Sequence, residues 1–177
     1  DRSLKVVDGL LNGSNVIWIG QDGFEELICL IWSNLWGTSR FNFHFGINFN
    51  PSAVSTTKQS LVCTPESLKA IWQKEKFTIV DKEDTIENPS PGVSYIVNHN
   101  TDSTFKNFLN QLCAQPESIK ELSVLEKGLE KLQSNPEHYK QFDSPNGWGL
   151  YINFVPFVAN YLKACKNFPE TTINCDR

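Results

Sequence analysis

Residues 41–49, Phe41-Asn-Phe-His-Phe-Gly-Ile-Asn-Phe49, form the most regular stretch of this sequence. Large apolar side chains alternate with small or polar ones along its whole length. Alternate side chains of a β-strand point to opposite faces, so this pattern predicts a strand with one buried and one polar face. The expected core face carries Phe41, Phe43, Phe45, Ile47 and Phe49, and the opposite face carries Asn42, His44 and Asn48.

Strands and helices are predicted to alternate on both sides of this stretch. The apolar run within residues 15–20 predicts a strand, and residues 60–63 and 77–80 predict two more. Apolar residues at helical spacing predict helices over residues 22–36 and 65–73. We therefore predict an α+β fold with a small mixed sheet of about four or five strands, and we expect both of these helices to cover one face of the sheet.

The second half of the chain is expected to be mainly helical. Residues 82–92 contain proline, glycine and several charges, which predicts a surface loop. Residues 93–97 fit either a last strand or the start of a helix, and residues 171–175 fit an edge strand. We therefore divide the chain into an α+β core, residues 1–97, and a helical extension packed on it, residues 98–177.

Composition limits the class of protein. Of the 177 residues, 40% are hydrophobic and 20% are charged, which is typical of globular proteins. The net charge is −4, and the absence of a strongly basic patch argues against a nucleic-acid partner. No apolar run is long enough to predict a membrane span. The sequence begins with Asp1 and contains no Met, so we interpret it as a piece of a longer polypeptide from which a targeting signal could be missing.

The cysteines favour a reducing compartment. Cys29, Cys63, Cys113, Cys165 and Cys175 are odd in number and irregularly spaced, which is not the pattern of a disulfide framework. Cys165 and Cys175 would close a short loop only in an oxidising compartment. A cytoplasmic location is therefore the better interpretation.

Sequence motifs for catalysis or cofactor binding are sparse. The three histidines stand alone, and neither a metal-ligand spacing nor a glycine-rich phosphate loop occurs, so we expect no cofactor and no intrinsic enzyme activity. The best catalytic alternative is a cysteine hydrolase. Cys63 lies before a predicted helix N-terminus, which lowers a thiol pKa, and His44 lies on the neighbouring predicted strand. The other interpretation is that Cys63 packs against the sheet and His44 faces solvent.

Aromatic residues beside glycines suggest an interaction surface. Trp36, Trp148 and Tyr151 lie at the ends of predicted elements, where a side chain can remain exposed. Because aromatic residues are enriched at protein interfaces, we take these three as candidates for partner binding. The other interpretation places each of them in the core.

Residues 32–80 also carry a family resemblance. Leu35-Trp36, Arg40, the aromatic stretch ending at Pro51, Leu61-Val-Cys-Thr-Pro-Glu-Ser-Leu68 and Trp72 occur in that order. This arrangement resembles the N-terminal domain of bacterial GTPase-associated adaptor proteins from NTP-dependent conflict (anti-phage) systems, over roughly residues 4–130. The resemblance implies a non-catalytic adaptor or sensor whose partners are a GTPase and other subunits of the same system.

The C-terminal part resembles a different group. Leu125-Glu-Lys-Gly-Leu129, the Asn146–Tyr151 segment and Phe157–Cys165 look like a small module of bacteria and phages that has no settled function. That module usually ends in Ser-Arg, whereas this chain ends in Cys175-Asp176-Arg177. This second resemblance implies a prokaryotic context and no catalytic role.

Overall fold

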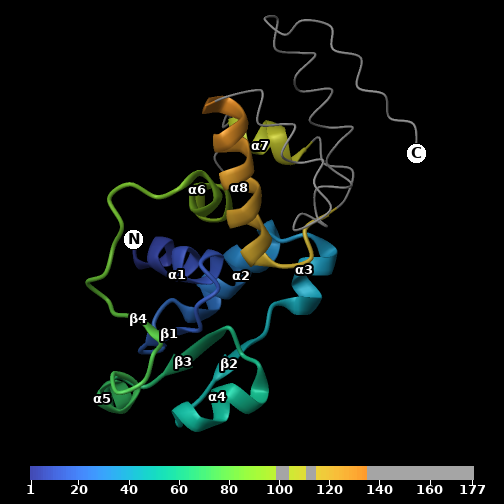
Figure 1. Ribbon diagram of the computed structural model, residues 1–177. Coiled ribbons are helices and arrows are strands. Elements are labelled where there is room, and N and C mark those ends of the chain that lie inside the picture. The colour runs from blue at the N-terminus through green and yellow to red at the C-terminus, as the bar shows by residue number, and fades with distance from the viewer. Residues whose placement is uncertain (99–103, 111–114, 135–177) are drawn as a thin grey trace, which may run out of the picture.

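Strands β1 (Val16–Ile19) and β3 (Leu61–Thr64) form the centre of the molecule in the computed structural model, which describes residues 1–98, 104–110 and 115–134 (Figure 1). They pair in parallel, with Val16 beside Leu61 and Ile19 beside Thr64. All residues of both strands are buried. This burial explains why neither strand shows a polar face in the sequence, since a parallel sheet is covered by helices on both sides.

Two shorter strands complete the sheet, β2 (Phe45–Ile47) beside β3 and β4 (Thr78–Val80) beside β1, in the order β2-β3-β1-β4. The α+β class and the strand number are confirmed, but every pairing among the described residues is parallel, so the sheet is not mixed. Each crossover between consecutive strands contains a helix, and such a crossover returns the chain to the same end of the sheet. The crossovers contain α2 (Phe24–Asn34), α3 (Gly37–Asn42), α4 (Pro51–Thr57), the 3₁₀ turn η1 (Glu66–Leu68) and α5 (Lys69–Trp72).

The two faces of the sheet have separate cores. Val16 and Trp18 point to one face, where α1 (Arg2–Leu11) and α2 pack, whereas Ile17 and Ile19 point to the other. Trp72 of α5 and Val54 of α4 fill that second core. The expectation that helices 22–36 and 65–73 cover the same face is therefore wrong. They cover opposite faces because the crossovers from β1 and from β3 run on opposite sides.

The aromatic stretch at residues 41–49 differs most from its prediction. Residues 37–42 form helix α3, and only residues 45–47 form a strand. Phe43 is buried, but the other members of the expected core face are exposed; the exposed fractions are Phe41 84%, Phe45 39%, Ile47 57% and Phe49 60%. Phe41 lies in α3 and Phe49 follows β2, whereas Phe45 and Ile47 belong to β2, which in the described part of the chain is an edge strand with β3 as its one strand neighbour.

Helices α6 (Pro91–Asn98), α7 (Thr104–Leu109) and α8 (Ile119–Ser134) pack above α1 and α2 (Figure 1). Residues 93–97 are thus helical, which resolves the alternative that the sequence left open. Phe105 and Leu122 belong to the same core as Val7 and Ile31. Residues before and after position 97, where we expected the core domain to end, therefore share one hydrophobic core. The expected edge strand at residues 171–175 lies outside the described residues.

None of the helices in the described part of the chain has the length and apolar character needed to cross a bilayer.

Candidate functional site

The carboxyl ends of β1 and β3 lie at a reversal of the winding direction. The crossover that leaves β1 leads to β2 at one edge of the sheet. The crossover that leaves the adjacent β3 leads to β4 at the opposite edge. Open parallel sheets bind ligands at such a reversal, outside the carboxyl ends of the strands. This edge of the sheet is therefore the first place to look for a site.

The loop between β1 and α2 is shaped by two glycines. Gly20 and Gly23 have positive φ angles of 84° and 77°, a backbone region that glycine enters without steric cost. Gly23 is the N-cap of α2 and supplies no side-chain hydrogen bond to the first turn of the helix. The amide groups at this helix end therefore have no side-chain cap, and they carry the positive end of the helix dipole.

Arg2 from the first turn of α1 covers this loop. Its guanidinium donates to the carbonyl oxygen of Ile19 at 3.1 Å and also to the carbonyl oxygen of Asp22. The guanidinium carbon lies 3.3 Å from the centre of the Trp18 ring, a cation–π contact. Arg2 thereby links α1 to the end of β1.

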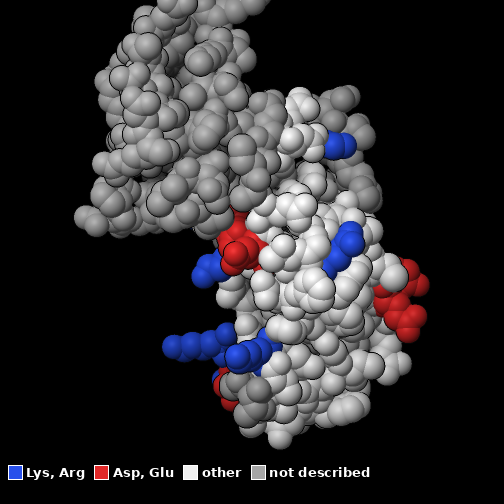
Figure 2. Space-filling view, turned by 90° about the vertical axis from the view of Figure 1, so that its right-hand side faces the viewer, with Lys and Arg blue, Asp and Glu red and all other residues white. Residues whose placement is uncertain are grey.

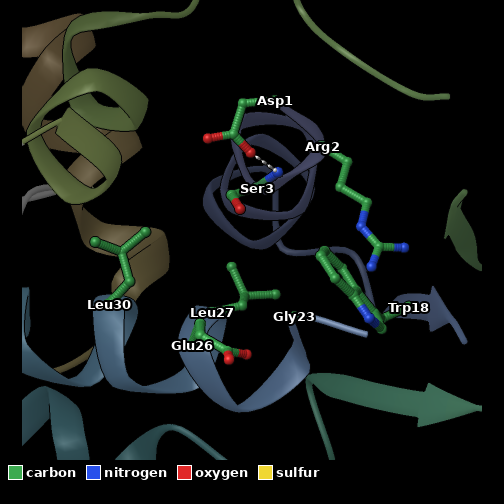
Figure 3. Close-up of a pocket in the computed structure, with 8 residues that line it drawn as sticks. All are labelled: Asp1, Arg2, Ser3, Trp18, Gly23, Glu26, Leu27 and Leu30. Atoms are coloured by element: carbon green, nitrogen blue, oxygen red, sulfur yellow. Dashed lines mark hydrogen bonds between the residues drawn. The ribbon is translucent and has the colours of Figure 1, made fainter. Parts of the chain in front are cut away.

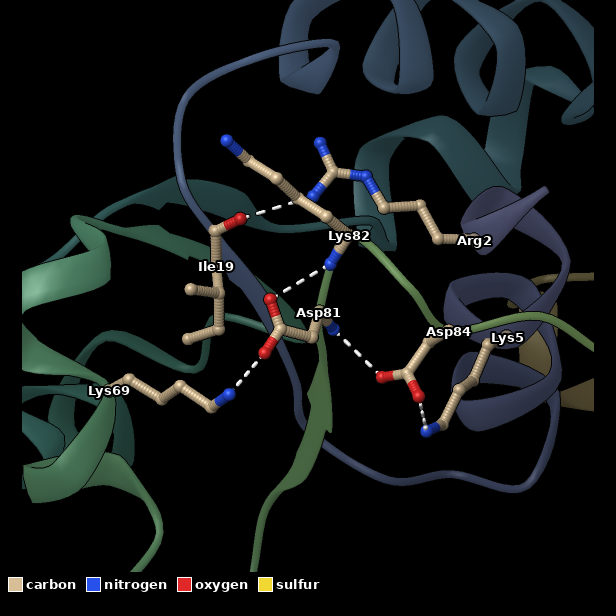
Figure 4. A network of polar contacts seen from close by, with 7 residues as sticks. All are labelled: Arg2, Lys5, Ile19, Lys69, Asp81, Lys82 and Asp84. Atoms are coloured by element: carbon tan, nitrogen blue, oxygen red, sulfur yellow. Dashed lines mark hydrogen bonds and ion pairs between the residues drawn. The ribbon is translucent and has the colours of Figure 1, made fainter.

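Ion pairs next to Arg2 connect the ends of β4 and α5 (Figure 4). Asp81 pairs with Lys69 and accepts a hydrogen bond from the Lys82 amide at 2.9 Å. The hydrogen bond from Lys69 lowers the pKa of Asp81. Asp84 accepts from the Asp81 amide at 2.8 Å and pairs with Lys5 at 2.9 Å. These ion pairs join the segment that follows β4 to α1 and α5.

A pocket of about 410 Å³ opens beside Arg2, between the N-terminal turns of α1 and α2 (Figure 3). Trp18, Leu27 and Leu30 provide its apolar lining, and Arg2 and Glu26 are among its polar residues. Trp18 is 2% exposed, and within the described residues its Nε1 has no hydrogen-bond partner. The sequence showed no sign of this pocket because α1 and α2 come together only in the tertiary fold, where α6 packs against both.

Cys63 and His44, the catalytic alternative, are not brought together. Cys63 is 1% exposed, and its thiol donates to the Gly20 carbonyl oxygen at 3.2 Å. Burial raises the pKa of Cys63, which outweighs the opposite effect of Arg2. His44 is exposed and precedes β2, whereas the β2 residue beside Cys63 is Ile47. His44 lies three residues before Ile47, which places it roughly 10 Å along the strand direction from the position of Cys63, at the usual strand rise.

Of the three residues predicted to form an interaction surface, the structure describes only Trp36. Trp36 is half-buried and stacks on Tyr95, with ring centres 5.8 Å apart, so much of its surface is used within the chain. Trp148 and Tyr151 lie outside the described residues.

A different set of large apolar residues is exposed, on and around the edge strand β2. The set consists of Trp32, Phe41, Phe45, Ile47 and Phe49, which we call the β2-edge surface. Trp32 meets Phe45 edge-on, with ring centres 5.9 Å apart, so α2 and β2 contribute to one continuous surface. Figure 2 shows that the side of the molecule on which α3 and α4 lie carries few charged residues. The alternation at residues 41–49 identified most of this set, but not its exposure.

Residues 1–98, 104–110 and 115–134 contain no group of three or more His, Cys, Asp or Glu side chains placed to hold a metal ion. Comparison with known protein families, curated proteins and solved structures finds no match to this chain.

Proposed function

We propose that this chain is a protein-interaction domain that binds its partner through the β2-edge surface. The observation that carries the proposal is the exposure of Phe45 and Ile47 on one face of β2, with the exposed Trp32 ring against Phe45 and the exposed Phe41 and Phe49 nearby in sequence. Single exposed apolar residues are common on proteins, but contiguous groups of them mark binding sites. Aromatic side chains supply much of the binding energy at protein interfaces.

The free edge of β2 adds a second means of binding. Among the described residues β2 pairs with β3 alone, so its other side offers backbone groups to an extended segment of a partner. Adding a strand to an open edge is a common mode of peptide recognition. The partner we propose therefore contributes an extended, apolar segment that lies along β2 and covers Phe45 and Ile47.

The family resemblance supplies the identity of this partner. The motifs within residues 32–80 resemble the GTPase-associated adaptors, and β2 lies inside that segment. We propose that the partner is the GTPase, or another subunit, of a bacterial defence system, and that the complex works in the cytoplasm.

The test is a binding measurement between the purified protein and the purified GTPase encoded beside its gene. Ile47→Asn places a polar group in the centre of the β2-edge surface, so it should weaken binding about tenfold or more, as loss of an interface hot spot does. Isothermal titration calorimetry measures this affinity directly.

Ile71→Asn is the matched control. Ile71 of α5 is 46% exposed, similar to Ile47 at 57%, but α5 packs on the opposite face of the sheet. We expect this variant to bind like the original protein. Equal affinity of all three proteins would refute the β2-edge surface as the binding site, and absence of binding by the unaltered protein would refute the proposed partner.

A further inference from the structure

The outer edge of β2 is complementary to a second copy of itself. In the described part of the chain β2 is the last strand of the sheet, beside β3 (Figure 1). We propose that β2 pairs in antiparallel orientation with β2 of a second copy of this chain, about a two-fold axis at Gly46. This inference rests on the proposed function, because the second copy occupies the β2-edge surface until the partner displaces it.

The backbone of β2 has its polar groups in the right places for this pairing. The Asn48 amide donates to the Cys63 carbonyl oxygen at 3.0 Å, so residues 46 and 48 direct their backbone groups toward β3. Successive residues of a strand alternate in this respect, so Phe45 and Ile47 direct theirs to the outer edge. These two residues lie one place on either side of Gly46. A two-fold axis there brings Phe45 of one copy opposite Ile47 of the other, as a pair that exchanges both N–H···O bonds.

The side chains of β2 match across the same axis. Phe45 and Ile47 lie beside Leu61 and Cys63 of β3, which belong to the core between the sheet and α2. Both side chains therefore lie on the α2 face, where Trp32 meets Phe45. In the dimer the aromatic ring of one copy packs against the β-branched isoleucine of the other. Such cross-strand pairs stabilise antiparallel sheets.

Charge does not oppose the approach of a second copy at this edge. Asp, Glu, Lys and Arg are absent from residues 41–57, although the whole chain carries a net charge of −4. Soluble proteins commonly protect an edge strand from pairing with another chain by a charged residue or a proline. β2 consists of Phe45, Gly46 and Ile47 and has neither. A second copy of the chain covers this edge without bringing like charges together.

The exposed area sets the expected strength of the dimer. An aromatic side chain presents about 150–250 Å², so the partly exposed residues of the β2-edge surface supply on the order of 500 Å² per copy. A standard specific interface buries about 800 Å² per partner, and smaller interfaces belong to weak, transient complexes. We therefore expect a weak dimer, which leaves the edge able to exchange its second copy for the partner.

The first experiment is sedimentation velocity of the purified protein alone, from about 10 μM to about 500 μM, a range that brackets a weak dimer. The mass should rise with concentration from that of the 20.1 kDa chain toward twice this value. Ile47→Lys places a charge in the pairing strand and should weaken self-association about tenfold or more. Ile71→Lys adds the same charge at an exposed isoleucine of α5, on the opposite face of the sheet, and should change it by less than about twofold.

A mass that does not change with concentration, or equal losses in the two variants, overturns the dimer. The proposed partner is judged separately by calorimetry, because no GTPase is present in this measurement.

The second experiment tests the position of the axis by disulfide cross-linking. In Gly46→Cys the two introduced residues are directly opposed, with Cα atoms about 4.5 Å apart, a separation that a disulfide spans. Phe49→Cys places a cysteine at another exposed position, but the two copies of residue 49 lie roughly 20 Å apart at opposite ends of the paired strands. Under mild oxidation Gly46→Cys should form covalent dimers beyond the background of the unaltered protein, in which Cys29 is exposed, and Phe49→Cys should not. Equal cross-linking of the two variants overturns the antiparallel pairing at Gly46.

Discussion

Strands β1 and β2 are both apolar in sequence, but they have opposite surroundings. Every residue of β1 is buried, between β3 and β4 within the sheet and between helices on both faces, whereas Phe45 and Ile47 of β2 are exposed. Apolar character alone therefore does not determine burial; a strand also needs neighbours that cover it. Where the cover is missing, an apolar strand becomes a candidate binding surface.

Phe43 and Phe41 give the largest expected difference. Phe43 is 5% exposed, so Phe43→Ala should lower the free energy of unfolding by about 3–5 kcal/mol. Phe41, two residues earlier in the same alternating stretch, is 84% exposed, and Phe41→Ala should change it by less than about 0.5 kcal/mol. Urea denaturation of both variants measures the difference. A large loss for Phe41→Ala would show that its side chain is covered.

The isoleucines Ile17 and Ile47 test the same comparison with identical chemistry. Ile17 in β1 is fully buried, and Ile17→Ala should lower the free energy of unfolding by about 2–5 kcal/mol. Ile47→Ala at the edge should cost less than about 0.5 kcal/mol. Thermal and urea unfolding both report these values. Similar losses at the two positions would contradict the edge position of β2.

The elements around the centre of the sheet were predictable because local signals agreed there. Predicted strands at residues 15–20, 60–63 and 77–80 correspond to β1, β3 and β4. The predicted helix at residues 22–36 corresponds to α2, which ends at Asn34, and Gly37 begins the separate helix α3. Each of these segments has a periodicity that fits its final surroundings.

The candidate sites were not predictable because they depend on contacts between distant segments. The exposure of residues 45–49 depends on the strand order, and periodicity carries no information about which strand lies at an edge. The pocket depends on Arg2 from α1 reaching Trp18 in β1 and the loop before α2. Cys63 was placed correctly on a strand, but the strand continues to Thr64, whose hydroxyl accepts a hydrogen bond from Trp72 Nε1 at 2.9 Å.

Two glycines extend the comparison to close packing. A Cβ at Gly9 of α1 would lie 2.8 Å from Val16 Cγ2 and 3.3 Å from Thr78 Cγ2, both in short side chains of the sheet. Overpacking costs about 1–3 kcal/mol, which exceeds the helix propensity that Ala gains, so Gly9→Ala should lose about 1 kcal/mol. At the edge, a Cβ at Gly46 would meet Gln59 Nε2 at 2.3 Å, the end of a side chain that can move away. Gly46→Ala should therefore be neutral within about 0.5 kcal/mol, and urea denaturation again measures both.

Two carboxylates apply the same contrast to charge, and we expect opposite pH dependences from them. Glu126 of α8 is half-buried and accepts from Ser90 at 3.0 Å; burial raises its pKa above the ordinary value of 4.5. The folded state then holds this proton more tightly, so stability falls as pH rises through the raised pKa, and Glu126→Gln should be more stable than the original protein at pH 7.

The hydrogen bond from Lys69 lowers the pKa of Asp81 below 3.8, so Asp81 contributes stability above that pH and loses it as pH falls through the lowered pKa. Asp81→Asn should therefore be slightly less stable at pH 7, and both differences should shrink in acid. Unfolding curves recorded from pH 7 down to pH 3 measure them. A Glu126→Gln variant that is less stable at pH 7 would show that the charged carboxylate is favoured between α6 and α8, contrary to the effect of burial.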